Sequence, residues 1–188
     1  LAVMPWNFPI WQVFRFLAPA MMAGNVAVLK HAVTVPRCAD AIESILRNAG
    51  VPEGVFATLH IDNAQTAALI GDPRIQAVTL TGSERAGKSV AATAGAHLKK
   101  CVMELGGSDP FVVLQDADLD VAIKIAVASR FGNAGQTCIA AKRFILVDAI
   151  AEAFVERFVA AVGALRIGDP NDEASTLAPM ARTDLRDE

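Results

Sequence analysis

Residues 75–94, IQAVTLTGSERAGKSVAATA, change within a few positions from a β-branched run to a helical pattern. Gly82 stands at the change, and Ser83 follows it as a residue type that often caps the first turn of a helix. The free backbone N–H groups of such a first turn favour a bound anion. The stretch therefore predicts a strand, a tight turn and a helix. Gly82 and Ser83 form either an ordinary helix start or a phosphate-binding turn.

The same alternation continues towards the N-terminus. We expect strands at 25–30 and 55–60 and helices at 36–49 and 63–70. Strands and helices in turn at this spacing predict βαβ units and a parallel sheet, in which ligands bind outside the carboxyl ends of the strands. Residues 1–104 are therefore predicted to form an open α/β nucleotide-binding layer.

The pattern changes after Gly106 and Gly107. Strands at 110–114 and 143–147, a helix from Asp116, and a last amphipathic helix are expected there; its apolar stripe contains Ile150, Phe154 and Phe158. We place a domain boundary at this point, with a first domain at 1–104 and a second at 105–188. The predicted fold class is α/β, with a parallel-sheet domain followed by the start of a second α/β domain.

Composition limits the classes of partner. The 188 residues are 53% hydrophobic and 20% charged, which is enough for a core, and no apolar run has the length of a membrane span. A net charge of -3 with scattered Lys and Arg predicts no nucleic-acid interface, so a small molecule is the expected partner. The chain begins inside an apolar run and ends on charged residues, and we expect it to be an internal piece of a longer protein.

Cysteines and histidines are isolated from one another, at Cys38, Cys101, Cys138, His31, His60 and His97. This spacing matches no disulfide framework and no zinc motif, so we expect no metal site and a reducing, cytoplasmic setting. The three histidines are expected on the surface or in loops.

Cys138 lies in FGNAGQTCIAAKR, residues 131–143, among small and amide side chains. These neighbours leave the thiol accessible and provide backbone donors that stabilise a thiolate, whereas a structural cysteine is usually surrounded by larger apolar side chains. A structural thiol remains the alternative. No histidine is near in sequence to act as the base of a Cys–His pair.

Two further residues have the chemistry of an active site. VMELGG, 102–107, places Glu104 at a strand end beside apolar residues, where partial desolvation suits a general base; a Glu that points to water is the alternative. MPWNFP, 4–9, holds Asn7 between aromatic residues, where its amide can donate to a developing oxyanion. A packed turn before a helix is the alternative there.

MPWNFP, GNVAVLK, TGSERAG, MELGG and FGNAGQTC together resemble the aldehyde dehydrogenase superfamily, in order and across nearly all of the chain. Within it, WNFPIWQVFR, LKHA, ELGGSDP and CIAAKRF are most similar to the succinate-semialdehyde dehydrogenase branch. The resemblance implies an incomplete aldehyde dehydrogenase fold. A Rossmann-like cofactor domain is followed by the start of a catalytic domain that bears the nucleophile.

The resemblance also implies roles. An aldehyde, succinate semialdehyde in this branch, is oxidised with NAD or NADP through a cysteine thiohemiacetal and thioester. Cys138 is the nucleophile, Asn7 holds the oxyanion, Glu104 activates water, and no metal takes part. Arg15 binds the substrate carboxylate. The implied cofactor contacts are Trp6, Lys30, Gly82, Ser83 and Leu105.

Two positions depart from the family pattern. Val33 replaces a Glu that often disfavours a 2′-phosphate but adds no positive charge beyond Lys30, so use of NAD is expected, with use of both NAD and NADP as the alternative. Gly132 stands where some members have a second substrate arginine, which leaves Arg15 as the one anchor. The resemblance implies a homo-oligomer, and because relatives are more than twice as long, we do not expect this piece alone to turn over.

Two other classes of protein compete. A cysteine-dependent hydrolase or acyl transferase would use Cys138 and Glu104 without a nucleotide, but Lys30 and the Gly82–Ser83 turn argue against it. A catalytically silent structural member of the superfamily is disfavoured because Cys138, Glu104 and Asn7 are all intact.

Overall fold

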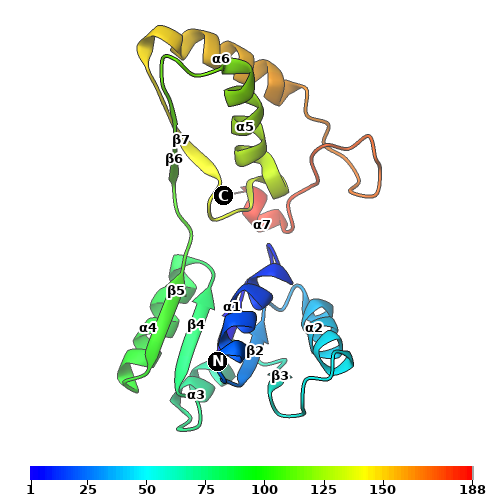
Figure 1. The fold of residues 1–188 in the computed structure, drawn as a ribbon, viewed down its shortest axis with the longest axis vertical. Coiled ribbons are helices and arrows are strands. Elements are labelled where there is room, and N and C mark those ends of the chain that lie inside the picture. Colours follow the sequence, from blue (N-terminus) through cyan, green and yellow to red (C-terminus); the bar gives the residue numbers. More distant parts are fainter. Residues whose placement is uncertain (188) are drawn as a thin grey trace. The chain divides into compact units, whose positions relative to one another are not determined.

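The computed structural model describes residues 1–187, and Glu188, the last residue of the predicted second domain, lies outside the described residues. The chain divides into two compact units (Figure 1). The first unit is Leu1–Leu105 and the second begins at Gly106. The division falls next to the expected boundary at Glu104, and each unit is described by itself.

The first unit is built on a five-stranded parallel sheet of order β3-β2-β1-β4-β5 (Figure 1). Its strands are β1 (Ala2–Met4), β2 (Ala27–His31), β3 (Phe56–Thr58), β4 (Ala77–Thr81) and β5 (Lys100–Glu104). Its helices are α1 (Trp11–Met22), α2 (Pro36–Asn48), α3 (Asn63–Gly71) and α4 (Glu84–Ala96). The prediction of an open parallel sheet is confirmed. The strand order reverses between β1 and β4, where ligands bind in sheets of this kind.

Side chains of the sheet alternate between two apolar layers. Ala2 and Met4 of β1 belong to a cluster with buried residues of α1 and α2, whereas Val3 packs against a second cluster that includes residues of α3 and α4. The first cluster is Ala2, Met4, Val13, Leu17, Ala27, Leu29, Ala39, Ile42, Leu46 and Phe56. Helices therefore cover both faces of the sheet, which fixes the strand ends that position the site.

Short side chains cap the starts of α3 and α4 in this unit. Ser83 caps α4 as predicted, because its Oγ accepts a hydrogen bond from the Ala86 N–H at 3.3 Å. Helix α3 begins at Asn63, as predicted. Its cap is Asp62, whose side chain accepts from the Gln65 N–H, and the Gln65 side chain returns a bond to the Asp62 N–H, which makes a capping box.

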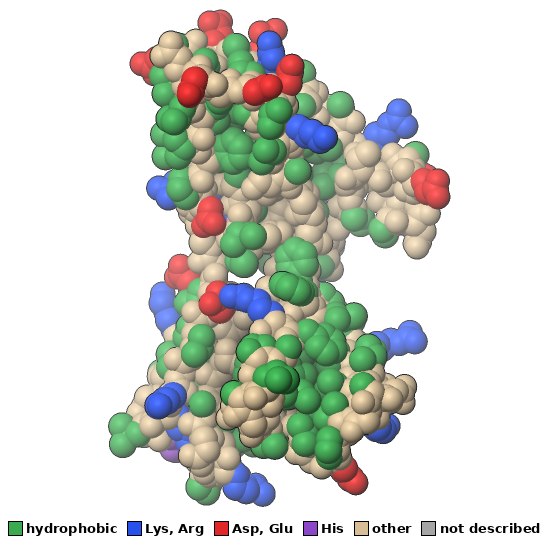
Figure 2. Space-filling model, viewed as in Figure 1, with side chains coloured by type: hydrophobic (Ala, Val, Ile, Leu, Met, Phe, Trp, Pro, Cys, Tyr) green, Lys and Arg blue, Asp and Glu red, His purple; other side chains and the backbone are tan. Residues whose placement is uncertain are grey.

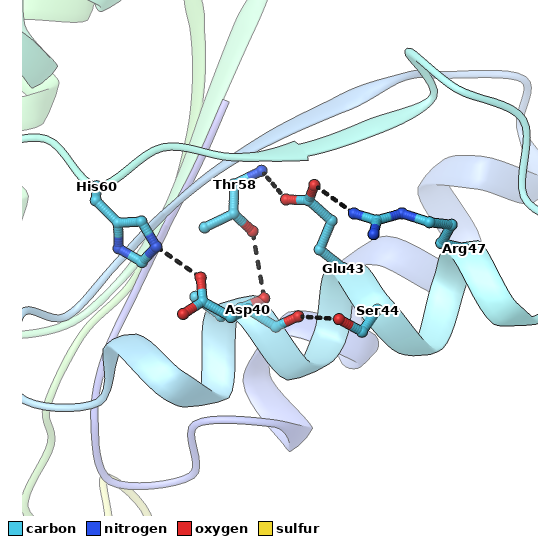
Figure 3. Close-up of polar contacts among 7 residues, drawn as sticks. Asp40, Glu43, Ser44, Arg47, Thr58 and His60 are labelled. Carbon is cyan, nitrogen blue, oxygen red and sulfur yellow. Dashed lines mark hydrogen bonds and ion pairs between the residues drawn. The ribbon is translucent and has the colours of Figure 1, made fainter.

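Polar contacts attach α2 to the edge strand β3 (Figure 3). The Glu43 carboxylate accepts from the Thr58 N–H at 2.9 Å and from Arg47 at 3.2 Å. His60, beyond the strand, lies 2.7 Å from the Asp40 carboxylate. The short strand β3 is thus held from its side by one helix face.

The second unit contains a two-stranded parallel sheet of β6 (Asp109–Val113) and β7 (Ala141–Leu146). Its helices are α5 (Leu119–Phe131), the 3-10 turn η1 (Gly132–Gly135), α6 (Asp148–Gly163) and α7 (Thr183–Asp187) (Figure 1). Helix α5 begins later than the expected Asp116. The Asp118 side chain accepts from the N–H groups of Asp120 and Val121 and so defines the start.

Phenylalanines form the core of the second unit. Phe154 of α6 is 1% exposed, and its ring centroid lies 5.8 Å from that of Phe158 and 6.1 Å from that of Phe144. The predicted apolar stripe of this helix is confirmed.

Figure 2 shows hydrophobic side chains at the surface of both units, with Lys and Arg side chains spread among them. Within residues 1–187, no helix has the length and apolar character needed to cross a membrane.

Candidate active site

The carboxyl ends of four strands meet at one edge of the first unit's sheet. Met4, the last residue of β1, pairs with His31, the last residue of β2. Thr81 of β4 pairs with Glu104 of β5 in the same way. Because all these strands are parallel, the residues at and after their ends lie along one edge. The candidate residues placed there are Trp6, Asn7, Lys30, Gly82, Ser83, Glu104 and Leu105.

Lys30 is a buried cation near this edge, only 9% exposed. Burial lowers the pKa of its ammonium group from the ordinary value. Among residues 1–187, none forms a salt bridge with it. Since a buried charge is stabilised by a partner, this position fits a ligand that brings hydroxyl or anionic groups.

Gly82 and Ser83 join the end of β4 to α4. The Gly82 N–H donates to the Glu104 carbonyl at 2.9 Å, which aligns the ends of β4 and β5. The Ser83 Oγ caps the helix as an acceptor, so its own proton is available to a ligand. Together with the free N–H groups of the first turn, this is an arrangement that suits a phosphate.

Glu104 lies in a different environment from the one predicted. Its carboxylate is 49% exposed and lies 3.4 Å from the Arg15 guanidinium, which also contacts the buried Gln12 at 3.5 Å. The prediction that Glu104 is desolvated by its apolar neighbours is therefore wrong for this unit. Both Arg15 and Glu104 line a cavity of about 1070 Å³. A carboxylate thus already occupies the position next to Arg15.

Trp6 and Asn7 are half-buried in the irregular segment between β1 and α1. This segment is fixed by His31, whose ring lies 2.8 Å from the Pro9 carbonyl oxygen. The expectation that His31 lies at the surface is wrong, since it is 6% exposed, while His60 and His97 are exposed as expected. Its place at the end of an apolar strand was the available signal.

Leu105 follows Glu104 and packs against α4. A Cβ added at Gly87 would lie 2.6 Å from Leu105 Cδ2, so a larger residue there would require the end of the Leu105 side chain to shift. Leu105 belongs to the apolar cluster of α3 and α4. The structure therefore gives Leu105 a packing role at the sheet edge.

Cys138 belongs to the second unit, in a turn between η1 and β7, and is half-buried. The prediction that it lies in a loop beyond a helix end is confirmed. The turn before it has a left-handed backbone at three successive residues, Asn133 (φ 54°), Ala134 (φ 56°) and Gly135 (φ 74°). For a non-glycine residue this conformation costs roughly 1–2 kcal/mol, and such strain is concentrated at functional sites.

Two basic side chains attach the cysteine turn to the glycine segment. Lys142 Nζ donates to the Gly107 carbonyl at 2.5 Å and to the Cys138 carbonyl at 3.3 Å. Arg143 Nε donates to the Ser108 carbonyl at 2.8 Å. Sequence reasoning missed both residues. Two adjacent cations at the start of the strand after a glycine-rich turn were the signal that could have found them.

No group of three or more His, Cys, Asp or Glu residues within 1–187 is arranged to hold a metal ion. Cys38, Cys101 and Cys138 are free thiols.

The chain thus combines a parallel-sheet edge that has a phosphate-type turn with a strained cysteine turn. Residues 1–188 match the aldehyde dehydrogenase family, and the chain belongs to it. It is 59% identical over 188 residues to the succinate semialdehyde dehydrogenase [NAD(P)+] Sad of Escherichia coli. It is also 54% identical over 188 residues to the succinate-semialdehyde dehydrogenase [NADP(+)] of Mycolicibacterium paratuberculosis.

Solved structures agree with this assignment. The protein Gox0499, studied for its cofactor and substrate selection, is similar with 51% identity and a TM-score of 0.96 over 99% of this chain. The succinic semialdehyde dehydrogenase of Streptococcus pyogenes, in complex with NADP+, has 43% identity and a TM-score of 0.96 over 99% of this chain. Both curated matches extend over the whole of this chain. The chain itself spans only 41% and 40% of the length of those two relatives, and 41% of each of the two solved structures.

Proposed function

We propose that the whole protein that contains these 188 residues oxidises succinate semialdehyde to succinate with NAD+ or NADP+. The observation that carries the proposal is the sheet edge, where Asn7, Lys30, Ser83 and Glu104 lie at the ends of parallel strands. The names of the similar dehydrogenases support the same chemistry. Since the chain spans about 41% of those proteins, the activity is assigned to the whole protein.

The cofactor fits the residues present. Lys30 offers a buried cation for ribose hydroxyls or a phosphate, and Gly82 with Ser83 offers the helix start for the pyrophosphate. Trp6 and Leu105 supply apolar surface beside them. A cofactor held by these residues would supply the acceptor for the hydride.

Cys138 begins the proposed reaction as a thiolate that adds to the aldehyde carbon, which gives a thiohemiacetal oxyanion. The Asn7 amide and the Cys138 N–H donate to that oxygen. Loss of hydride from the same carbon leaves a thioester on Cys138. Glu104 then takes a proton from water, whose oxygen attacks the thioester carbonyl; the carboxylic acid forms and the thiolate is released.

Arg15 is proposed to bind the far carboxylate of the substrate. Its guanidinium holds a carboxylate in this structure, that of Glu104 at 3.4 Å, and such charge-assisted bonds are strong and geometrically specific. A bound substrate would replace Glu104 on Arg15. The base would then be free to approach water.

Val33 supports use of both cofactors. It is 76% exposed and uncharged, so it offers no repulsion to a 2′-phosphate near Lys30. The similar proteins include one named for NAD(P)+ and others named for NADP+. We also propose a homo-oligomer in the cytoplasm, a compartment that the three free cysteines suit.

The cysteine hydrolase or acyl transferase without nucleotide is not favoured, because the similar proteins are named as dehydrogenases.

A rate assay tests the proposal: NAD(P)H formation by the whole protein is followed with succinate semialdehyde and with hexanal. Arg15→Ala is expected to slow succinate semialdehyde oxidation at least about tenfold more than hexanal oxidation. Equal slowing of both aldehydes would exclude the carboxylate role. If the whole protein formed no NAD(P)H with either aldehyde, the proposed dehydrogenase activity would be excluded.

A further inference from the structure

His31 joins two segments of the first unit. It is the last residue of β2, directly after Lys30, and is 6% exposed. Its Nε2 lies 2.8 Å from the Pro9 carbonyl oxygen, and its Nδ1 accepts a hydrogen bond from the Ala32 N–H at 2.8 Å. The ring therefore connects strand β2 to the segment that carries Asn7.

The partners of the ring define its tautomer. The Ala32 N–H can only donate, so Nδ1 must be the bare acceptor nitrogen. The Pro9 carbonyl can only accept, so Nε2 must carry the hydrogen. A proton added at Nδ1 would remove the bond from Ala32. Burial, and secondarily the charge of Lys30, lower the pKa of His31, while the Pro9 and Met4 carbonyls act in the opposite direction.

The segment held by this bond has little regular structure of its own. Residues 5–10 lie between β1 and α1, outside both elements. From the helix side, the Phe8 carbonyl accepts from the Gln12 N–H at 3.0 Å. His31 supplies a contact from the sheet side, two residues beyond Asn7. A side-chain amide in such a segment keeps its direction only if the backbone beside it is held.

We propose that His31 is a positioning residue, whose Nε2–H bond to the Pro9 carbonyl holds the 5–9 segment so that the Asn7 amide points at the reacting oxygen. The proposal rests on the proposed function, since the oxyanion role of Asn7 belongs to it. A misplacement of about 1 Å in such a group can cost about a hundredfold in rate.

Two substitutions in the whole protein separate the two ring bonds. The amide nitrogen of His31→Gln can donate to the Pro9 carbonyl in place of Nε2, whereas His31→Asn keeps only an acceptor near Nδ1. We expect His31→Gln to keep most of kcat and His31→Asn to lose about tenfold to a hundredfold, with KM for NAD(P)+ unchanged in both. His60→Asn, in an exposed histidine bonded to Asp40, is the matched control and should leave kcat unchanged.

The outcomes are distinct. Equal loss in His31→Gln and His31→Asn would overturn the role of the Pro9 bond. A raised KM for NAD(P)+ with unchanged kcat would show that the residue acts through Lys30 and would also overturn it. Hydrogen exchange of the peptide that covers residues 5–12 is the readout that needs no activity. Faster exchange in His31→Asn but not in His31→Gln is expected, and no difference would contradict the proposal even if the proposed function fails.

A measurement on the unmodified protein decides the matter if His31→Asn does not fold. Nitrogen-15 NMR of the His31 ring should show the neutral tautomer with hydrogen on Nε2. Hydrogen on Nδ1 with none on Nε2 would overturn the proposal.

Discussion

The sheet edge of the first unit and the cysteine turn of the second position their candidate residues in different ways. At the sheet edge, Lys30, Ser83 and Glu104 lie at strand or helix ends whose places follow from the parallel ladder. In the cysteine turn, three successive left-handed residues and two long basic side chains determine the path of the backbone. One site depends on regular structure, the other on local strain and a few specific bonds.

This difference has a physical consequence. A ladder spreads the effect of one substitution over many hydrogen bonds, so sheet-edge variants should lose one function each and stay folded. A strained turn has few alternatives, so small backbone changes there should disturb the position of the thiol itself. The following predictions test this contrast, from the largest expected effect to the smallest.

Cys138→Ala should lower aldehyde oxidation by the whole protein about a thousandfold or more, because no other group can form the thioester. Binding of NAD(P)+ should persist, since Lys30 and Ser83 belong to the other unit. Initial rates and cofactor titration by fluorescence measure the two effects. Cys101→Ala, at an exposed cysteine of β5, is the control and should keep full activity; loss of activity there would contradict the assignment.

Asn7→Ala should lower kcat about 10²–10³-fold, as expected for the loss of an oxyanion donor. The fold should be retained, because His31 still holds Pro9 and the ladder of β1 is unchanged. Steady-state kinetics and circular dichroism measure the two properties. If KM for the cofactor rose while kcat stayed constant, Asn7 would be a cofactor contact and not an oxyanion donor.

Gly135→Ala should destabilise the cysteine turn by about 1–2 kcal/mol, because L side chains disfavour its φ of 74°. The added Cβ would also lie 3.2 Å from the Arg130 carbonyl oxygen. Ala134→Gly is the matched opposite, since it removes a side chain at φ 56° and should not destabilise. Urea unfolding measures both variants. Equal stability of the two would show that backbone strain does not shape this turn.

The smallest of these effects should be the contribution of His31 to the pH dependence of the free energy of unfolding. Burial lowers the pKa of the ring below its ordinary value of 6.5, with Lys30 as the charged group that acts on it. As pH falls below 6.5, the unfolded chain takes up a proton that the folded protein excludes, so stability falls, by at most about 1.4 kcal/mol per pH unit for one proton. Urea unfolding of the unmodified protein and His31→Gln from pH 5 to 8 tests this, and parallel curves would contradict it.

Regular structure and the residues tied to it were predictable from the sequence. The β-branched runs and the Gly82–Ser83 turn predicted strands, a helix start and the edge where Lys30 and Glu104 lie, because each depends on a local pattern. The Arg15–Glu104 pair was not predictable, since it joins a helix and a strand far apart in the chain. The left-handed backbone at Ala134 was not predictable either, because alanine shows no such preference and the conformation comes from the surrounding contacts.

Histidine shows the same limit. His31, His60 and His97 look alike as isolated residues, yet only the first is buried, and its role comes from Pro9, which the fold brings to it. A lone polar residue at the end of an apolar strand therefore calls for a search for its partner before it is assigned to the surface.

Trapping of the acyl intermediate tests the central claim, that Cys138 carries the acyl group and Glu104 activates the water that releases it. The Glu104→Gln variant of the whole protein is mixed with succinate semialdehyde and NADP+, stopped with acid and digested for mass spectrometry. We predict a succinyl thioester on the peptide that contains Cys138, formed together with a single burst of NADPH. Continued NADPH formation without this adduct, or an acyl group on another residue, would contradict the account.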